Sequence, residues 1–312
     1  MTIDRPRQHN HRRTAFTLIE LLTVVSIVAL LIGMLLPSMR RARRQGKATV
    51  CLSHLRSLGH GMTMYALEHG DAMVPARMPD LGDGINWRVH VSGGLKYRPT
   101  FLAILGDYVG VPAFDDPVDT KNAVDQFGER GSRQNYANDV YLCPSRADWT
   151  DERNGAYGYN YQFLGNARRY GATNPAGFKN WPVRTNIIRS PARCVAAADC
   201  MGTAASFADR KPYANNSRDA DRFGNEGFNL DPPRVDPLNG EMTNLTSSPQ
   251  SRTAADPRHL DRAAVLWTDG HGTMSTLMKL GYDTDASGVI TLDGANHLFN
   301  ITGADDAWID PS

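Results

Sequence analysis

The segment from Phe16 to Leu36 reads FTLIELLTVVSIVALLIGMLL, and Glu20 is its one ionisable residue. A helix of about 21 residues rises about 31 Å, which is the thickness of the hydrocarbon core of a bilayer. Because apolar residues occupy every side of this helix, the segment is typical of a membrane helix rather than of a helix in a soluble core. A secretory signal peptide would have a shorter apolar region that ends at a small-residue cleavage site, whereas this segment ends at Leu36-Pro37.

Composition and charge narrow the classes of function that the chain can have. The 312 residues carry a formal net charge of +1, so that the molecule has no overall field to attract nucleic acid. Basic residues lie on both sides of the apolar segment, with four arginines among the first 13 residues and a second cluster at residues 40–47. Because both flanks are basic, the positive-inside rule does not fix the orientation of the helix.

The helix is expected to continue beyond Pro37. Apolar side chains recur at intervals of three and four from Cys51 to Tyr65, which is the stripe of an amphipathic helix, and Gly70 is a suitable C-terminal cap. The expected parts are a membrane or filament-core helix at residues 16–37, its amphipathic continuation at 38–70, and a globular head at 71–312.

Short apolar runs predict strands in the head, with turn residues between them. Strands are expected at residues 140–145, 193–199, 263–268 and 273–278, and a short helix near 101–109. Residues 201–257 are polar and without a period, which predicts a long surface excursion. The pattern as a whole predicts an α+β fold, in which a long N-terminal helix packs on a mainly antiparallel sheet.

The N-terminal segment resembles the N terminus of type IV pilin-like proteins and type II secretion pseudopilins. These proteins have a short basic leader and a small residue, followed by a Phe-Thr-Leu-Ile-Glu segment that opens a long apolar helix. Here Ala15 is the small residue and Phe16 the first mature residue, so that Glu20 is the fifth mature residue and Pro37 the twenty-second, where pilins commonly have a helix-bending proline. Ala15 departs from the family pattern, in which Gly is usual.

The resemblance implies how the chain is processed and where it lies. A prepilin peptidase would remove a leader of residues 1–15 by cutting between Ala15 and Phe16, and would methylate the new Phe16 amine. The leader would face the cytoplasm, the helix would cross the inner (cytoplasmic) membrane once, and the head would lie in the periplasm or on the cell surface.

Glu20 suggests a role in assembly. A carboxylate near the start of a membrane helix is costly unless it is paired. In a filament of staggered helices, Glu20 of one subunit can neutralise the Phe16 amine of a neighbour. A charged pair among apolar helices contributes register more surely than net stability.

Four further segments resemble a group of pilin-like proteins that is abundant in planctomycetes. His259, nine residues and then Asp269-Gly270 match the C-terminal motif of that group. Its Cys-Pro-Ser and Tyr-Gly-Tyr-Asn segments correspond to residues 143–145 and 157–160, and its usual helix exit to residues 51–59.

His259 and Asp269 also invite an enzymatic interpretation, because a His–Asp pair can orient an imidazole for base catalysis. No nucleophile elbow, His-Glu-x-x-His motif or phosphate-binding glycine loop accompanies them in the sequence. His271 could complete a metal site with them, although no known spacing supports it. The favoured interpretation is a hairpin turn at Asp269-Gly270 with a structural His259, and no enzyme activity.

An acidic segment at residues 283–293 is a candidate calcium loop, and Ca²⁺ is the one candidate cofactor. Its oxygen ligands would be Asp283, Asp285, Ser287 and Asp293, although Gly294 stands where a calcium loop has Glu. The favoured alternative is a hairpin with its turn at residues 285–288.

The four cysteines are Cys51, Cys143, Cys194 and Cys200, and they lack the paired short spacings of a zinc site. A strand between Cys194 and Cys200 would hold them about 20 Å apart, too far for a disulfide. Cys51 with Cys143 is therefore the candidate disulfide, and four buried free thiols are the alternative.

These features predict a structural subunit, a pseudopilin or minor pilin, of a type II secretion or type IV pilus-like fibre. The implied partners are the prepilin peptidase/methyltransferase, other pilins or pseudopilins, the membrane and an inner-membrane secretion platform, without nucleic acid. Two alternatives stay open: a pilin-anchored surface binding or adhesion protein without a role in building fibres, and a membrane-tethered hydrolase around His259.

Overall fold

The computed structural model describes residues 17–77, 88–120, 123, 126, 134, 136–145, 157–165, 167–168, 178–179, 182–200, 229–234, 253–286, 290–291 and 293–305. The chain divides into two compact units, Met1–Arg44 and Gln45–Ser312. The division falls inside helix α1 (Leu18–Glu68), which confirms the long N-terminal helix expected from the sequence.

The part of α1 in the first unit is an exposed apolar helix. Every residue from 18 to 44 is exposed, and the segment is long and apolar enough to cross a membrane. The hydroxyls of Thr23, Ser26 and Ser38 donate hydrogen bonds to backbone carbonyls one turn earlier, so that they present no unpaired polar group to lipid. Pro37 lies inside the helix without ending it.

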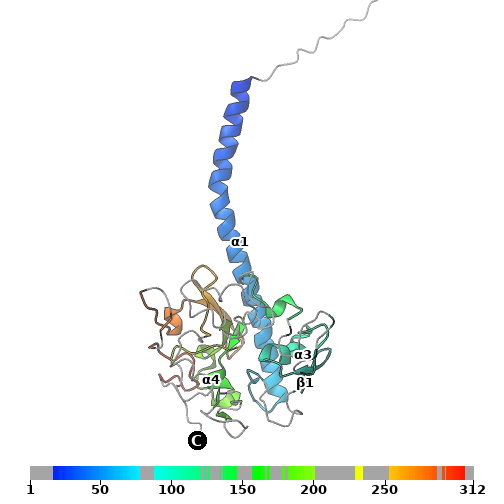
Figure 1. The fold of residues 1–312 in the computed structure, drawn as a ribbon. Helices are drawn as coiled ribbons and strands as arrows, with labels where there is room; N and C mark the ends of the chain where they lie inside the picture. The colour runs from blue at the N-terminus through cyan, green and yellow to red at the C-terminus, as the bar shows by residue number, and fades with distance from the viewer. Residues whose placement is uncertain are drawn as a thin grey trace, which may run out of the picture. The chain divides into compact units, whose positions relative to one another are not determined.

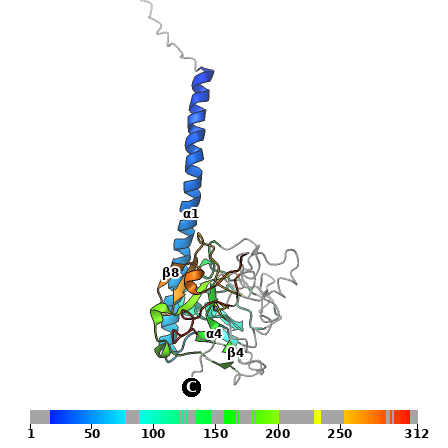
Figure 2. The same cartoon turned by 90° about the vertical axis from the view of Figure 1, so that its left-hand side faces the viewer.

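The second unit is built on a four-stranded antiparallel sheet in the order β3-β6-β7-β8. Figures 1 and 2 show this unit folded around the C-terminal part of α1. Its strands are β3 (Tyr157–Tyr159), β6 (Val195–Asp199), β7 (Ala263–Trp267) and β8 (Gly272–Ser275). Both central strands, β6 and β7, are buried along their whole length. Such burial explains their continuous apolar sequence, because neither face of these strands meets solvent.

The C-terminal part of α1 packs against the β7–β8 hairpin. Its buried residues include Cys51, Leu55 and Leu58, members of the stripe expected from the sequence. A Cβ atom at Gly59 would lie 2.8 Å from Leu266 and 3.0 Å from Gly270, so the helix approaches the hairpin more closely than a larger residue allows. The helix ends at Glu68, and Gly70 has a φ of 62°, as predicted for the C-terminal cap.

Smaller elements surround this centre. The two-stranded sheets are β1 (Arg88–Val91) with β2 (Gly94–Tyr97), and β4 (Ala167–Arg168) with β5 (Phe178–Lys179). The short helices are α2 (Phe101–Ile104), α3 (Gly106–Val109) and α4 (Tyr161–Leu164), of which α2 and α3 form the helical segment expected near residues 101–109. Single 3₁₀ turns are η1 (Asp139–Tyr141), η4 (Thr185–Ile187), η5 (Pro191–Arg193) and η8 (Met278–Leu280). The α+β architecture with antiparallel sheets is therefore confirmed.

Two local predictions are wrong. Residues 140–145 do not form a strand: η1 occupies Asp139–Tyr141, because the backbone N–H of Tyr141 bonds Asn138 and its hydroxyl bonds the carbonyl of Val111. The expected surface excursion at 201–257 also fails where the structure describes it. Residues 229–233 and 253–256 are buried, and they bond Tyr159, Asp199 and each other.

Candidate functional site

The start of α1 is held by a reciprocal pair of hydrogen bonds between Thr17 and Glu20. The Glu20 carboxylate accepts bonds from the Thr17 backbone N–H at 2.9 Å and hydroxyl at 2.8 Å, and the Thr17 hydroxyl accepts one from the Glu20 N–H at 3.2 Å. This arrangement is a capping box, which satisfies backbone donors at a helix N terminus. Ala15 and Phe16 lie outside the described residues, so the assembly role of Glu20 stays a prediction.

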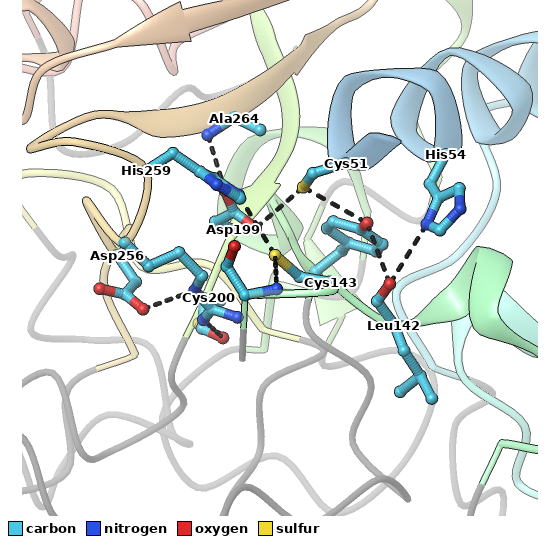
Figure 3. A network of polar contacts seen from close by, with 12 residues as sticks. Cys51, His54, Leu142, Cys143, Asp199, Cys200, Asp256, His259 and Ala264 are labelled. Carbon is cyan, nitrogen blue, oxygen red and sulfur yellow. Dashed lines mark hydrogen bonds and ion pairs between the residues drawn. The ribbon is translucent and has the colours of Figure 1, made fainter. Parts of the chain in front are cut away.

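A second site lies in the second unit, where four buried side chains converge. Their ligand atoms, the Sγ atoms of Cys51 and Cys143, a carboxylate oxygen of Asp199 and a ring nitrogen of His259, all lie within 4.8 Å of one another. Figure 3 shows the four side chains pointing toward one another from separate parts of the fold. Each residue is at most 3% exposed.

Four different elements supply these side chains. Cys51 lies on the buried stripe of α1, Cys143 follows η1, and Asp199 is the last residue of β6. His259 opens a tight turn that leads into β7, with backbone hydrogen bonds in both directions between His259 and Arg262. Both central residues of that turn, Leu260 and Asp261, have positive φ, as in a type I′ turn. The unusual backbone therefore fixes the position of His259.

The contacts form a closed polar network. His259 Nε2 lies 3.2 Å from Cys143 Sγ and 3.2 Å from Asp199 Oδ2, and Cys51 Sγ lies 3.3 Å from Asp199 Oδ1. Further donors reach the network from outside. Ala264 N–H donates to Asp199 Oδ2 at 2.7 Å, and Ser145 N–H donates to Cys143 Sγ at 3.4 Å.

The network shifts the pKa values of its two thiols in opposite directions. Burial alone would raise the pKa of Cys143, but hydrogen bonds with Cys51 and His259 and the charge of Arg258 outweigh it and lower that pKa to about 7. Burial, the hydrogen bond with Cys143 and the Asp199 carboxylate raise the pKa of Cys51. Cys143 is therefore the thiol that ionises first.

Asp199 and His259 form a buried ion pair beside these thiols. Burial opposes ionisation of Asp199, but the bond to His259 and the charge of Arg258 hold its pKa below the usual value. Burial would lower the pKa of His259, but Asp199 and Cys143 raise it to about 9. His259 Nδ1 is buried without a hydrogen-bond partner among the described residues.

Arg258 brings a second buried charge next to the cluster. Its Nε lies 2.6 Å from Asp256 Oδ2, and its Nη2 donates to the Cys200 carbonyl at 2.7 Å. The side chain is 7% exposed, and its Nη1 has no hydrogen-bond partner in the described part of the chain. A buried guanidinium of this kind favours anionic neighbours.

The predicted His259–Asp269 pair is not brought together as a catalytic dyad. Asp269 instead bonds His271, with 2.5 Å between Oδ1 and Nδ1, on the exposed turn between β7 and β8. The hairpin at Asp269-Gly270 is thus confirmed, and the acidic partner of His259 is Asp199. His271 pairs with Asp269 and does not join His259 at the cluster.

The candidate calcium loop shows the pairing that its hairpin alternative predicts. Thr284 and Ile290 form an isolated antiparallel bridge, and Thr291 N–H donates to the Asp283 carbonyl at 2.9 Å. Asp283, Asp285 and Asp293 are exposed, and Ser287 lies outside the described residues. Calcium binding at this loop stays a prediction.

The structure bears on both cysteine predictions, the Cys51–Cys143 disulfide and the alternative of four buried free thiols. Cys51 and Cys143 are neighbours, as the candidate disulfide requires, but both are free thiols in the structure, as are Cys194 and Cys200. Cys194 and Cys200 flank strand β6, as expected.

Sequence reasoning missed Asp199, which it treated only as the end of a strand. The signal was a carboxylate closing an otherwise apolar run, Val195–Asp199, because an acidic residue is rarely buried without a partner. Tyr157 was missed as well, although its hydroxyl lies 3.4 Å from Cys51 Sγ. Three segments of the planctomycete-type resemblance, at residues 51–59, 143–145 and 157–160, thus meet His259 at one place.

The comparisons with known proteins concern the N-terminal segment. Residues 10–36 match a family model described as "Prokaryotic N-terminal methylation motif". No curated protein and no solved structure matches the chain. The match includes Ala15, Phe16 and Glu20, and it supports the resemblance of this segment to type IV pilin-like proteins.

Proposed function

We propose that this chain is a structural subunit, a pseudopilin or minor pilin, of a type II secretion or type IV pilus-like fibre. The observation that carries the proposal is the position of the methylation motif, residues 10–36, which ends inside α1 and so includes the first part of that helix. The motif supplies a processing signal, and α1 supplies an exposed apolar helix that needs lipid or other helices to cover it.

In this proposal the N-terminal helix serves two states of the protein. Before assembly it lies in the inner membrane, with the leader on the cytoplasmic side. After a prepilin peptidase removes residues 1–15 and methylates the Phe16 amine, the same apolar surface packs against the helices of other pilins. Glu20 then pairs with the Phe16 amine of a neighbouring subunit and fixes the register between helices.

The head favours a minor or tip position over that of a bulk subunit. The unit Gln45–Ser312 is large compared with the apolar helix that it accompanies, and such a head leaves much surface for partners other than neighbouring subunits. The partners in this proposal are other pilins and an inner-membrane platform driven by a cytoplasmic ATPase. The proposal assigns no catalytic activity to the chain.

Mass spectrometry of the mature N terminus tests the processing step. We expect the chain isolated from cells that contain a prepilin peptidase to begin at an N-methylated Phe16. Ala15→Gly, which restores the usual residue before the cut, is the matched variant and should be cleaved at least as completely. A mature chain that begins at Met1, or one cut beyond Leu36, would contradict the proposal.

Deletion of the gene separates the fibre subunit from a surface binding protein that uses the helix only as an anchor. A fibre subunit predicts loss of fibre assembly or of secretion when the chain is absent. A pilin-anchored adhesion protein predicts intact fibres, together with loss of binding to a surface or polysaccharide.

A further inference from the structure

We propose that Cys51, Cys143, Asp199 and His259 bind one Zn²⁺ ion as a closed, four-ligand structural site inside the second unit, Gln45–Ser312. The site is independent of the fibre proposal, because all four residues lie in the unit Gln45–Ser312. It goes beyond the candidate calcium loop, with which it shares no residue.

The set of donors suits zinc. Thiolate sulfur, imidazole nitrogen and carboxylate oxygen are the three protein ligands of Zn²⁺, and four of them complete its tetrahedral shell. Calcium and magnesium prefer oxygen ligands alone, so the two sulfur donors argue against them. Because four protein ligands leave no open position, the site is structural rather than catalytic.

The distances between the donors also fit. Metal–ligand bonds of zinc imply donor–donor separations of about 3.3–3.8 Å around a tetrahedron. The contacts of His259 Nε2 with Cys143 Sγ and Asp199 Oδ2 are both 3.2 Å, and that of Cys51 Sγ with Asp199 Oδ1 is 3.3 Å. All four donors lie within 4.8 Å of one another, so that shifts of about 1 Å would bring them onto a zinc shell.

Groups outside the cluster support its anionic donors, as the second shell of a metal site does. Ser145 N–H donates to the sulfur of Cys143, Ala264 N–H donates to the carboxylate of Asp199, and the Tyr157 hydroxyl lies 3.4 Å from the sulfur of Cys51. Each of the three anionic donors thus has a hydrogen-bonding group from outside the cluster.

The positive charge of Arg258 offsets the net charge of the proposed zinc complex. Zn²⁺ with two thiolates, one carboxylate and a neutral imidazole carries one net negative charge. Arg258 places a buried positive charge that acts on both Cys143 and Asp199, and its Nη1 makes no hydrogen bond within the described residues. The guanidinium therefore offsets the charge that the zinc complex would bring into a dry interior.

A disulfide between Cys51 and Cys143 explains less of the arrangement. It would use the two sulfurs and leave Asp199 and His259 as a buried pair with no part in the link. Zinc uses all four side chains, and it joins α1, the segment after η1, the end of β6 and the turn before β7 at one point. That junction supplies a physical reason for burying four costly groups together.

Metal analysis of the full-length protein, purified in detergent without chelator or reductant, tests the proposal. We expect about one zinc per chain in the wild type and less than a tenth of that in Cys143→Ala. Cys194→Ala is the matched control, because Cys194 is also a buried free thiol but bonds the Phe299 carbonyl away from the cluster. It should retain the zinc.

Cobalt substitution keeps the test decisive if Cys143→Ala fails to fold. Co²⁺ added to chelator-treated wild-type protein should give the intense visible bands of a tetrahedral ion and thiolate-to-metal charge transfer in the near ultraviolet. Folded wild-type protein with neither zinc nor these bands would overturn the proposal. A Cys51–Cys143 disulfide found by peptide mass spectrometry in the same preparation would overturn it as well.

Discussion

The imidazole Nε2 of His259 lies 3.2 Å from the Oδ2 atom of Asp199, and both side chains are almost completely buried. The two residues are 60 positions apart in the chain, and the pair joins the end of β6 to the turn that starts β7. Asp269, the acidic residue that stands with His259 in the sequence motif, is engaged with His271 at the surface.

Asp199→Asn is therefore expected to destabilise the head strongly. The substitution keeps the size of the side chain but leaves His259 without its buried countercharge, whereas Arg258 keeps Asp256. Breaking a buried pair typically costs about 3–5 kcal/mol. Chemical denaturation of the full-length protein in detergent, followed by the fluorescence of tryptophan, measures the loss.

Asp269→Asn is the matched control, since it makes the same chemical change in a pair that is exposed. Exposed ion pairs contribute at most about 1 kcal/mol, so this variant should unfold almost as the wild type does. Equal losses in the two variants would show that the buried network does not hold the head together.

The turn that carries His259 contains backbone strain at Leu260 that a substitution can relieve. Leu260 has a φ of 52° and an exposed side chain, and a left-handed conformation costs a residue with a Cβ atom about 1–2 kcal/mol. Asn tolerates this conformation better, so Leu260→Asn should raise the free energy of unfolding by about 0.5–1 kcal/mol.

Thermal unfolding compares this variant with Arg262→Asn, which changes an exposed residue of the same turn that has no positive φ. The Arg262 variant should stay within about 0.5 kcal/mol of the wild type. If Leu260→Asn were instead clearly less stable than the wild type, the turn would need the leucine side chain rather than its backbone conformation.

The elements predicted well from the sequence are those with a local signal. The apolar run and the stripe that starts at Cys51 predicted α1, and Val195–Asp199 and Ala263–Trp267 predicted β6 and β7, because hydrophobic periodicity is set within a few residues. Residues 140–145 looked like a strand by the same criterion. The chain forms η1 at Asp139–Tyr141 instead, since distant contacts such as that of Tyr141 with Val111 override the local preference.

The buried cluster had no spacing signal in the sequence that marks a metal site. Zinc-binding sequences are recognised by short spacings between pairs of ligands, but here each of the four donors comes from a different segment of the chain. The resemblance at residues 51–59, at residues 143–145 and at His259 marked three of the four segments without showing that they meet. The register of β6 with β7 places Asp199 beside Ala264, near the turn of His259, and the packing of α1 and of the segment after η1 brings in Cys51 and Cys143.

Two glycines of α1 should respond in opposite directions to the same substitution. Gly46 has open space where a Cβ atom would stand, so Gly46→Ala should stabilise the helix by about 0.5–1 kcal/mol. At Gly59 the added atom would lie 3.0 Å from backbone atoms of Gly270, which cannot move as freely as a side chain. Gly59→Ala should therefore cost about 1–3 kcal/mol through overpacking.

Thermal unfolding of the two alanine variants checks the packing of α1 against the β7–β8 hairpin. Each variant serves as the control for the other, because both lie in the same helix and gain the same helix propensity. A stabilising Gly59→Ala would mean that the helix and the hairpin are less closely packed in solution than Gly59 and Gly270 indicate.

Glu20 has two roles that a pair of variants can separate. In the structure it caps α1 together with Thr17, and in the proposed fibre its charge neutralises the Phe16 amine of a neighbour. Glu20→Gln removes the charge but keeps an acceptor that serves in a capping box, whereas Thr17→Ala removes the hydroxyl and keeps the charge.

If the charge drives assembly, Glu20→Gln should abolish fibres while Thr17→Ala still forms them, and both chains should still be cut before Phe16. Electron microscopy of sheared fibres and mass spectrometry of the N terminus measure the two outcomes. If capping alone matters, the order reverses, because Gln can replace Glu in the capping box and nothing replaces the Thr17 hydroxyl. Normal fibres from Glu20→Gln would therefore exclude the proposed pairing with Phe16.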